Sequence, residues 1–206
     1  MAGLILAGGR SRRYGRDKAF EELNGKPLIE YVIEALGPAA SSLFLVVGSL
    51  DNFKGFNGRL TLVTDEVPGM GPLGGLYAGL KASPDDYSIV APCDSPFIDT
   101  ALVKHMLKTA AEAGVDALVP RYEGRDHTVN AVYSKTCLPA IESSLFDGHF
   151  RIASIFDKLK VEYIEDDTIN RFTGGSLSFF NVNTPENMVQ AGRILSERGG
   201  QDDQRQ

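Results

Sequence analysis

Short apolar runs alternate along the chain with longer segments of helical periodicity. Apolar runs bounded by turn residues predict buried strands, and apolar residues that recur every three or four positions predict helices. Strands are expected at 3–7, 43–48, 60–64, 87–91, 116–120, 130–134 and 161–164. Helices are expected at 27–36, 72–81, 99–113, 137–145, 153–159 and 185–198. This alternation predicts an α/β fold of three layers, with helices on both faces of a mostly parallel sheet.

The length and composition favour one globular domain. The chain has 206 residues, 43% of them hydrophobic, and no long polar linker divides it. A chain of this size can bury one sizeable core. We therefore expect a single domain over 1–198, followed by a disordered tail over 199–206, where the sequence is polar and rich in Gly and Gln.

Charge and special residues narrow the class of protein. The formal net charge of -6 disfavours a nucleic-acid partner. No apolar stretch approaches the roughly 18 residues that span a bilayer, and the first strand lacks the features of a signal peptide, so a cytoplasmic protein without a membrane partner is expected. Two cysteines and three scattered histidines form neither a disulfide scaffold nor a zinc motif. Cys93 and Cys137 are expected in the core.

A basic, glycine-containing loop follows the first predicted strand. It begins with Gly8 and Gly9 and carries four arginines, including Arg13, before Lys18. Glycine lets backbone N–H groups approach phosphate oxygens closely, and the basic side chains supply the countercharge. A solvated turn is the simpler interpretation, but ligands commonly bind beyond the first strand of an α/β sheet. The loop therefore predicts a polyphosphate site.

Asp94 follows the predicted strand at 87–91 and lies between Pro92 and Pro96. This rigid setting holds a carboxylate at the same edge of the sheet as the basic loop. Since Mg²⁺ is typically held by one or two carboxylates together with substrate phosphates, Asp94 is the candidate metal ligand. The alternative is that Asp94 only caps a turn.

Gly69, Gly71 and Gly74 match the dinucleotide-binding pattern G-x-G-x-x-G. In that fingerprint the first glycine follows the strand directly, whereas residues 65–68 intervene here and include two acidic side chains. We therefore interpret the match as accidental. Gly74, together with Gly75 and Gly79, is expected instead to form a smooth helix face that a flat base or ribose approaches closely.

Several motifs occur in one order over most of the chain: LAGG at 6–9, RYG at 13–15, DK at 17–18, GPLGGL at 71–76, PCDSP at 92–96 and NVNTPE at 181–186. This set resembles the molybdenum cofactor guanylyltransferases of the nucleotidyltransferase superfamily. The resemblance implies a Rossmann-like domain of the nucleotide-diphospho-sugar transferase type. It also implies Mg²⁺-dependent transfer of GMP from GTP to the terminal phosphate of molybdopterin, with release of pyrophosphate, and leaves room for transient contact with proteins that deliver molybdopterin.

The resemblance assigns roles to individual residues. It implies nucleotide contacts for Leu6, Ala7 and Gly8 within the LAGG motif that Gly9 completes, phosphate contacts for Lys18, contact with the guanosine end for Asp65, and metal binding for Asp94. The two glycines that end the first motif are the family's mark of guanine rather than cytosine, and this distinction depends on Gly8 alone.

Two departures from the family's pattern affect these expectations. Tyr14 stands where the family usually has methionine, in a loop whose nucleotide-binding character is otherwise kept. His127 is followed by Thr128, where family members often have His-Pro. Arg125, Asp126 and His127 are candidates to face the acceptor, although a lone histidine is equally well explained as a surface residue.

The charges of the reactants dictate the expected mechanism. A phosphate nucleophile is already anionic, so catalysis requires in-line alignment and neutralisation of charge rather than a strong base. Lys18 and Arg13 would neutralise the phosphates, and Asp94 would hold Mg²⁺. Asn181 and Asn183 are placed to bind the acceptor or a metal-bound water, while Asn183-Thr184-Pro185 also fits a helix N-cap.

Three other functions remain open from the sequence. A related transferase would use CTP or another nucleotide, on molybdopterin or another small acceptor. An oxidoreductase would bind NAD(P) through the glycines at 69–74 without Mg²⁺. A non-catalytic adaptor would bind nucleotide without turnover.

Overall fold

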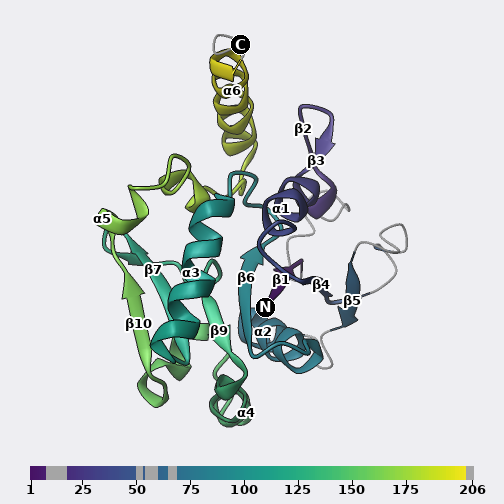
Figure 1. Cartoon of the computed structure of the whole chain (residues 1–206). Helices are drawn as coiled ribbons and strands as arrows, with labels where there is room; N and C mark the ends of the chain where they lie inside the picture. Colours follow the sequence, from purple (N-terminus) through teal and green to yellow (C-terminus); the bar gives the residue numbers. More distant parts are fainter. Residues whose placement is uncertain (8–17, 50–52, 54–59, 65–68, 203–206) are drawn as a thin grey trace.

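The computed structural model describes residues 1–7, 18–49, 53, 60–64 and 69–202, which form a main sheet flanked by helices (Figure 1). The strands are β1 (Ala2–Leu6), β2 (Glu22–Leu23), β3 (Lys26–Pro27), β4 (Ser42–Val47), β5 (Thr61–Thr64), β6 (Tyr87–Pro92), β7 (Ala117–Tyr122), β8 (Arg125–Asp126), β9 (Val132–Ser134) and β10 (Val161–Ile164). The α-helices are α1 (Leu28–Leu36), α2 (Gly71–Ala82), α3 (Thr100–Ala113), α4 (Leu138–Phe146), α5 (Asp166–Ile169) and α6 (Pro185–Asp202). The 3₁₀ helices are η2 (Lys18–Phe20), η3 (Lys135–Cys137), η4 (Ile152–Lys158) and η5 (Ser176–Phe179).

The main sheet is mostly parallel, as predicted. Its strands lie in the order β10-β7-β9-β6-β1-β4-β5, and β8 pairs with β7. Strand β1 is parallel to both β4 and β6, β4 is parallel to β5, and β7 is parallel to β10. Strand β9 is antiparallel to β6 and to β7. The carboxyl ends of the parallel strands therefore meet at one edge of the sheet.

The strand order reverses between β1 and β6. The chain runs from β1 through β4 to β5 on one side, and then returns to place β6 on the other side of β1. Leu6 and Pro92 are register partners at the carboxyl ends of these two strands, and the backbone N–H of Cys93 donates to the carbonyl oxygen of Leu6 at 3.1 Å. In open α/β sheets, ligands bind outside the carboxyl ends of the strands at such a reversal. The topology thus directs attention to the residues that follow β1 and β6.

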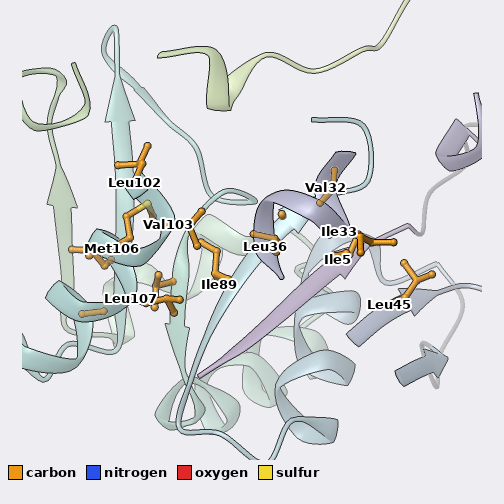
Figure 2. Close-up of a cluster of buried hydrophobic side chains, with 14 of the residues drawn as sticks. Ile5, Val32, Ile33, Leu36, Leu45, Ile89, Leu102, Val103, Met106 and Leu107 are labelled. Atoms are coloured by element: carbon orange, nitrogen blue, oxygen red, sulfur yellow. The ribbon is translucent and has the colours of Figure 1, made fainter. Parts of the chain in front are cut away.

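Two apolar clusters cover the two faces of the sheet. Ile5 belongs to the cluster formed with α1 and α3, of which Figure 2 shows ten labelled side chains. Its neighbour Leu4 belongs to the cluster formed with α2, α4 and η4. Successive side chains of a strand point to opposite faces, so this alternation buries β1 on both sides. The three-layer prediction is confirmed.

Two glycines of α2, Gly75 and Gly79, face the sheet. A Cβ atom added at Gly79 would lie 2.8 Å from Cδ1 of Leu4, and one added at Gly75 would lie 3.4 Å from Cδ2 of Leu6. These two glycines therefore allow α2 to pack closely on β1 and β4, and the expectation that they form a surface for a base is wrong. The reason is that the apolar residues of α2 share this face, which turns it toward the core.

A β-hairpin precedes α1 where the sequence analysis placed the start of the helix. Strands β2 and β3 pair antiparallel around Asn24 and Gly25, which have φ values of 52° and 77°. Two consecutive positive φ values define the tight hairpin turn that Asn-Gly favours. Pro27 belongs to β3, and α1 begins one residue later, at Leu28.

Three further elements differ from expectation. Strand β9 begins at Val132 and runs antiparallel, because the connection from β7 is too short for the crossover that a parallel pair requires. The expected helix at 153–159 is the 3₁₀ helix η4. Helix α6 continues to Asp202, four residues beyond its expected end, because glycine in a helix costs only about 1 kcal/mol. The expected tail at 199–206 is therefore helical as far as Asp202, and 203–206 lie outside the described residues.

Both cysteines pack with apolar side chains. Cys137 is fully buried beside α4, and burial raises the pKa of its thiol to about 12. Cys93 packs against the cluster formed with α1 and α3. Across the described part of the chain, no helix is both long and apolar enough to cross a membrane.

Candidate active site

Asp94 lies immediately beyond β6, at the strand reversal. The three residues that follow it, Ser95 to Phe97, are buried, so its loop is anchored in the core. Its carbonyl oxygen accepts a hydrogen bond from the backbone N–H of Val182 at 2.9 Å. The hydroxyl of Ser95 donates to Oδ1 of Asn181. These two bonds attach the segment before α6 to the end of β6.

Lys18 reaches the same point from the 3₁₀ helix η2. Its Nζ forms an ion pair with Oδ2 of Asp94 and donates a hydrogen bond to Oδ1 of Asn183 at 2.7 Å. The Lys18 and Asp94 side chains are each only 14% exposed. Ala19, the next residue in η2, is fully buried and fixes the start of the lysine side chain. The ammonium group is therefore held between two oxygens from distant parts of the sequence.

The segment before α6 has two roles. Oγ1 of Thr184 accepts the backbone N–H of Asn187 at 3.2 Å, as an N-cap side chain does. Oδ1 of Asn187 in turn accepts the backbone N–H of Asn183 at 3.2 Å. The capped helix start thus fixes the backbone of Asn183, while its side chain binds Lys18. The helix-cap interpretation is confirmed, with Thr184 as the capping side chain, and a site role for Asn183 stays a prediction.

A network of hydrogen bonds, partly buried, holds the chain at 174–178, just before the same segment. Oδ1 of Asp99 caps α3, and Oδ2 accepts the backbone N–H of Gly174 at 3.0 Å. The hydroxyl of Ser178 accepts the backbone N–H of Asp99 at 2.9 Å, and the amide of Asn130 donates to the carbonyl of Ser178 at 3.3 Å. Sequence reasoning missed this support for the loop that carries Asn181 and Asn183, because its members are far apart in the chain.

The oxygens of Asp94 and Asn183 suit a hard cation. Carboxylate and amide oxygens are ligands that Mg²⁺ accepts, and in this structure both already converge on one positive charge, the Lys18 ammonium. No group of three or more His, Cys, Asp or Glu side chains with metal-binding geometry occurs among the described residues. A metal at this point would therefore complete its coordination with ligand phosphates or water.

Other predicted site residues lie nearby or outside the described ranges. Leu6 ends β1, and the backbone N–H of Ala7 continues the sheet by donating to the carbonyl of Val46 at 2.9 Å. Gly74 is buried in the first turns of α2. Four of the predicted residues lie outside the described residues, namely Gly8, Gly9, Arg13 and Asp65. The structure thus brings together Lys18, Asp94, Asn181 and Asn183.

The glycines at 69–74 do not have the setting of a dinucleotide fingerprint. Strand β5 ends at Thr64, five residues before Gly69, and helix α2 already begins at Gly71. Strand β5 is also at the end of the strand order, whereas the reversal lies between β1 and β6. The fingerprint requires a strand that leads directly into the glycines at the reversal. The interpretation of this match as accidental is supported.

His127 packs against an aromatic ring at the carboxyl end of β7. Its ring centroid lies 4.2 Å from that of Phe179, and its backbone N–H donates to the carbonyl of Pro120 at 2.8 Å. Arg125 and Asp126 form the exposed strand β8, and Oδ1 of Asp126 accepts from Nε of Arg121 at 2.7 Å. The three residues lie at the same edge of the sheet as Asp94, and a contact of theirs with an acceptor stays a prediction.

We expect His127 to titrate below its ordinary value. Burial lowers the pKa of this imidazole from 6.5, so the unfolded chain binds the proton more readily. The contribution of the neutral His127 ring to the free energy of unfolding is therefore complete above pH 6.5. It is lost as the pH falls through the folded-state pKa. Proton NMR of the ring should give a midpoint below 6.5, and Phe179→Leu, which opens the site to solvent, should move that midpoint back toward 6.5. A midpoint at or above 6.5 in the unaltered protein would contradict this account.

Comparison with known proteins identifies the family. A family model described as "MobA-like NTP transferase domain" matches residues 3–163. The "Probable molybdenum cofactor guanylyltransferase" of Pelotomaculum thermopropionicum is 34% identical over 195 residues, which cover 95% of this chain and 93% of that protein. The "Molybdenum cofactor guanylyltransferase" of Desulfosudis oleivorans is 32% identical over 201 residues, which cover 94% and 98%.

A solved structure agrees with these relatives. The molybdopterin-guanine dinucleotide biosynthesis protein A of Archaeoglobus fulgidus superposes with a TM-score of 0.83 at 29% identity, covering 96% of this chain and all of that one. The similarity extends over nearly the whole chain. The resemblance seen in the sequence motifs is confirmed, and the chain belongs to the MobA-like NTP transferase family of nucleotidyltransferases.

Proposed function

We propose that the protein transfers GMP from GTP to the terminal phosphate of molybdopterin, giving molybdopterin guanine dinucleotide and pyrophosphate. The observation that carries the proposal is the grouping of Lys18, Asp94 and Asn183 at the strand reversal, where α/β folds bind nucleotides. Relatives that align over nearly the whole chain bear the name molybdenum cofactor guanylyltransferase, which supports GTP and molybdopterin as the ligands.

The reaction needs positioning more than proton transfer. An oxygen of the acceptor phosphate attacks the α-phosphorus of GTP, and the bond from that phosphorus to the β-phosphate oxygen breaks. Because the attacking oxygen is already anionic, no side chain has to remove a proton from it. The protein's task is to align the two phosphates in line and to offset their repulsion.

The ammonium group of Lys18 supplies positive charge for that task. We propose that Lys18 binds the nucleotide phosphates together with Arg13. Asp94 and Asn183 would hold Mg²⁺, which neutralises phosphate charge and stabilises the leaving pyrophosphate when bound. Asn181, held by Ser95, would bind the acceptor or a metal-bound water. The remaining proposed nucleotide contacts are Leu6, Ala7, Gly8, Gly9, Asp65 and Gly74.

Pyrophosphate release tests the proposal. Each of the four ribonucleoside triphosphates is supplied with Mg²⁺, with and without molybdopterin. Pyrophosphate release is expected with GTP and not with the other three nucleotides, and only when molybdopterin is present. Release with CTP instead would overturn the guanine assignment at Gly8 while keeping the class of reaction. No release with any nucleotide would overturn the proposed acceptor or the activity itself, and nucleotide binding measured by calorimetry would then identify an adaptor.

A further inference from the structure

The Lys18 ammonium contacts the two oxygens that the proposed function assigns to Mg²⁺. It touches Oδ2 of Asp94 and lies 2.7 Å from Oδ1 of Asn183, the two oxygens best suited to a hard cation at this edge of the sheet. Both members of the ion pair are largely shielded from water, at 14% exposure each. A carboxylate so little exposed requires a positive partner, and Lys18 provides one.

We propose that Lys18 is an internal cation which fills the metal position until nucleotide binds, and thereby makes metal and nucleotide binding interdependent. This inference rests on the proposed function only in assuming that nucleotide phosphates bind at this site. When phosphates arrive, the ammonium moves to them and leaves the oxygens of Asp94 and Asn183 to the metal. Asp94 then has a positive partner in both states.

The chemistry of lysine suits this exchange. Its ammonium is a compact charge on a flexible four-carbon stem, so it can change partners without movement of the backbone. The backbone itself is anchored, because Ala19 is buried and the carbonyl of Lys18 accepts the N–H of Glu21 at 3.1 Å. A divalent cation and the ammonium cannot share the same two oxygens, since like charges at contact distance repel strongly. Metal binding to the nucleotide-free protein must therefore displace Lys18.

Coupling of this kind is reciprocal. If the nucleotide draws Lys18 away and so strengthens metal binding, the metal strengthens nucleotide binding by the same factor. Such factors are typically about 5- to 150-fold. If the lysine and the metal had separate positions, removing the lysine would leave the metal affinity almost unchanged. Any gain would come only from the weak effect of removing a distant positive charge.

Mn²⁺ binding to the nucleotide-free, full-length protein tests the inference. Mn²⁺ accepts the same oxygen ligands as Mg²⁺, and its free concentration is read from its electron paramagnetic resonance signal. We expect Lys18→Met to bind Mn²⁺ at least about tenfold more tightly than the unaltered protein. Adding Asp94→Asn to Lys18→Met should abolish the gain, which locates the ion at Asp94. Lys26→Met is the matched control, because Lys26 also forms an ion pair, with Glu34, but on the hairpin before α1.

Equal Mn²⁺ affinity in Lys18→Met and the unaltered protein would overturn the inference, even if GTP turnover is found. A gain in Lys18→Met supports it even if the acceptor is not molybdopterin, because no nucleotide is present in this measurement. A gain of the same size in Lys26→Met would show a general charge effect and would also overturn it. Circular dichroism establishes that each variant is folded. If Lys18→Met is not, Lys18→Gln, with a neutral polar end, serves in the same comparison.

Discussion

Replacing Asp94 with asparagine is expected to lower kcat for pyrophosphate release by about 10²- to 10³-fold, or more. Asparagine keeps the shape of the side chain but removes the charge that pairs with Lys18 and would hold Mg²⁺. Without it, the negative charge that develops on the leaving pyrophosphate is no longer offset through this position. Steady-state assays at saturating GTP and acceptor measure the effect.

Asp85→Asn is the matched control for this change. Oδ1 of Asp85 lies 3.0 Å from the amino terminus, and this ion pair is at the amino end of β1, opposite the reversal. The substitution therefore removes one paired carboxylate without touching the site, and kcat should stay within about twofold of the unaltered value because surface ion pairs contribute little. If Asp94→Asn and Asp85→Asn lower kcat equally, Asp94 has no special part in the reaction.

Gly175→Ala should lower the free energy of unfolding more than Gly48→Ala. A Cβ atom at Gly175 would lie 2.1 Å from the carbonyl oxygen of Ile169 and 3.0 Å from its carbonyl carbon. These are backbone atoms of a fully buried residue, so no side chain can rotate to relieve the overlap. Overpacking in a core typically costs about 1–3 kcal/mol, and we expect the upper end of that range. Urea unfolding followed by circular dichroism gives the free energy of unfolding.

Gly48→Ala provides the comparison. Gly48 has open space around the position of a Cβ atom, so the free energy of unfolding should change by no more than about 0.5 kcal/mol. Gly175 is also the N-cap residue of η5, which leads into Asn181 and Asn183. A second effect is therefore expected in Gly175→Ala, a rise in KM for GTP under conditions where the variant is folded. Equal stability of the two variants would show that the chain at 169–175 shifts freely.

Local pattern determined most of the fold that the sequence predicted. Strand β10 was predicted at its observed bounds, and α3 was predicted within one residue of its observed start. Both depend on neighbouring residues alone. The direction of β9 depends instead on the length of the connection before it, which periodicity does not report. The hairpin at Asn24-Gly25 was not predicted, although this dipeptide is a strong local signal, because Pro27 also fits the first position of a helix.

The sequence indicated which residues belong to the candidate site better than it indicated how they contact one another. Motif resemblance assigned roles to Lys18 and Asp94, and its place before the last helix made Asn183 a candidate. The structure brings the three together. That Lys18 pairs directly with Asp94 could not be read from the sequence, because it depends on how far the lysine stem reaches in the folded chain. The role of Gly79 was misread for a related reason. A glycine that admits a ligand and one that admits a strand have the same sequence signature, and only packing distinguishes them.

The contact between Lys18 and Asn183 joins residues 165 positions apart. During synthesis the chain emerges from its amino end, so the lysine and Asp94 are made long before the asparagine. The family match ends at residue 163, before the segment that supplies Asn181 and Asn183. A chain that ended at that boundary would keep most of the sheet but would lack Asn183, whose side-chain oxygen contacts Lys18. The grouping of Lys18, Asp94 and Asn183 is thus completed only by a segment made after residue 163, and termination at that residue would remove Asn183 from it.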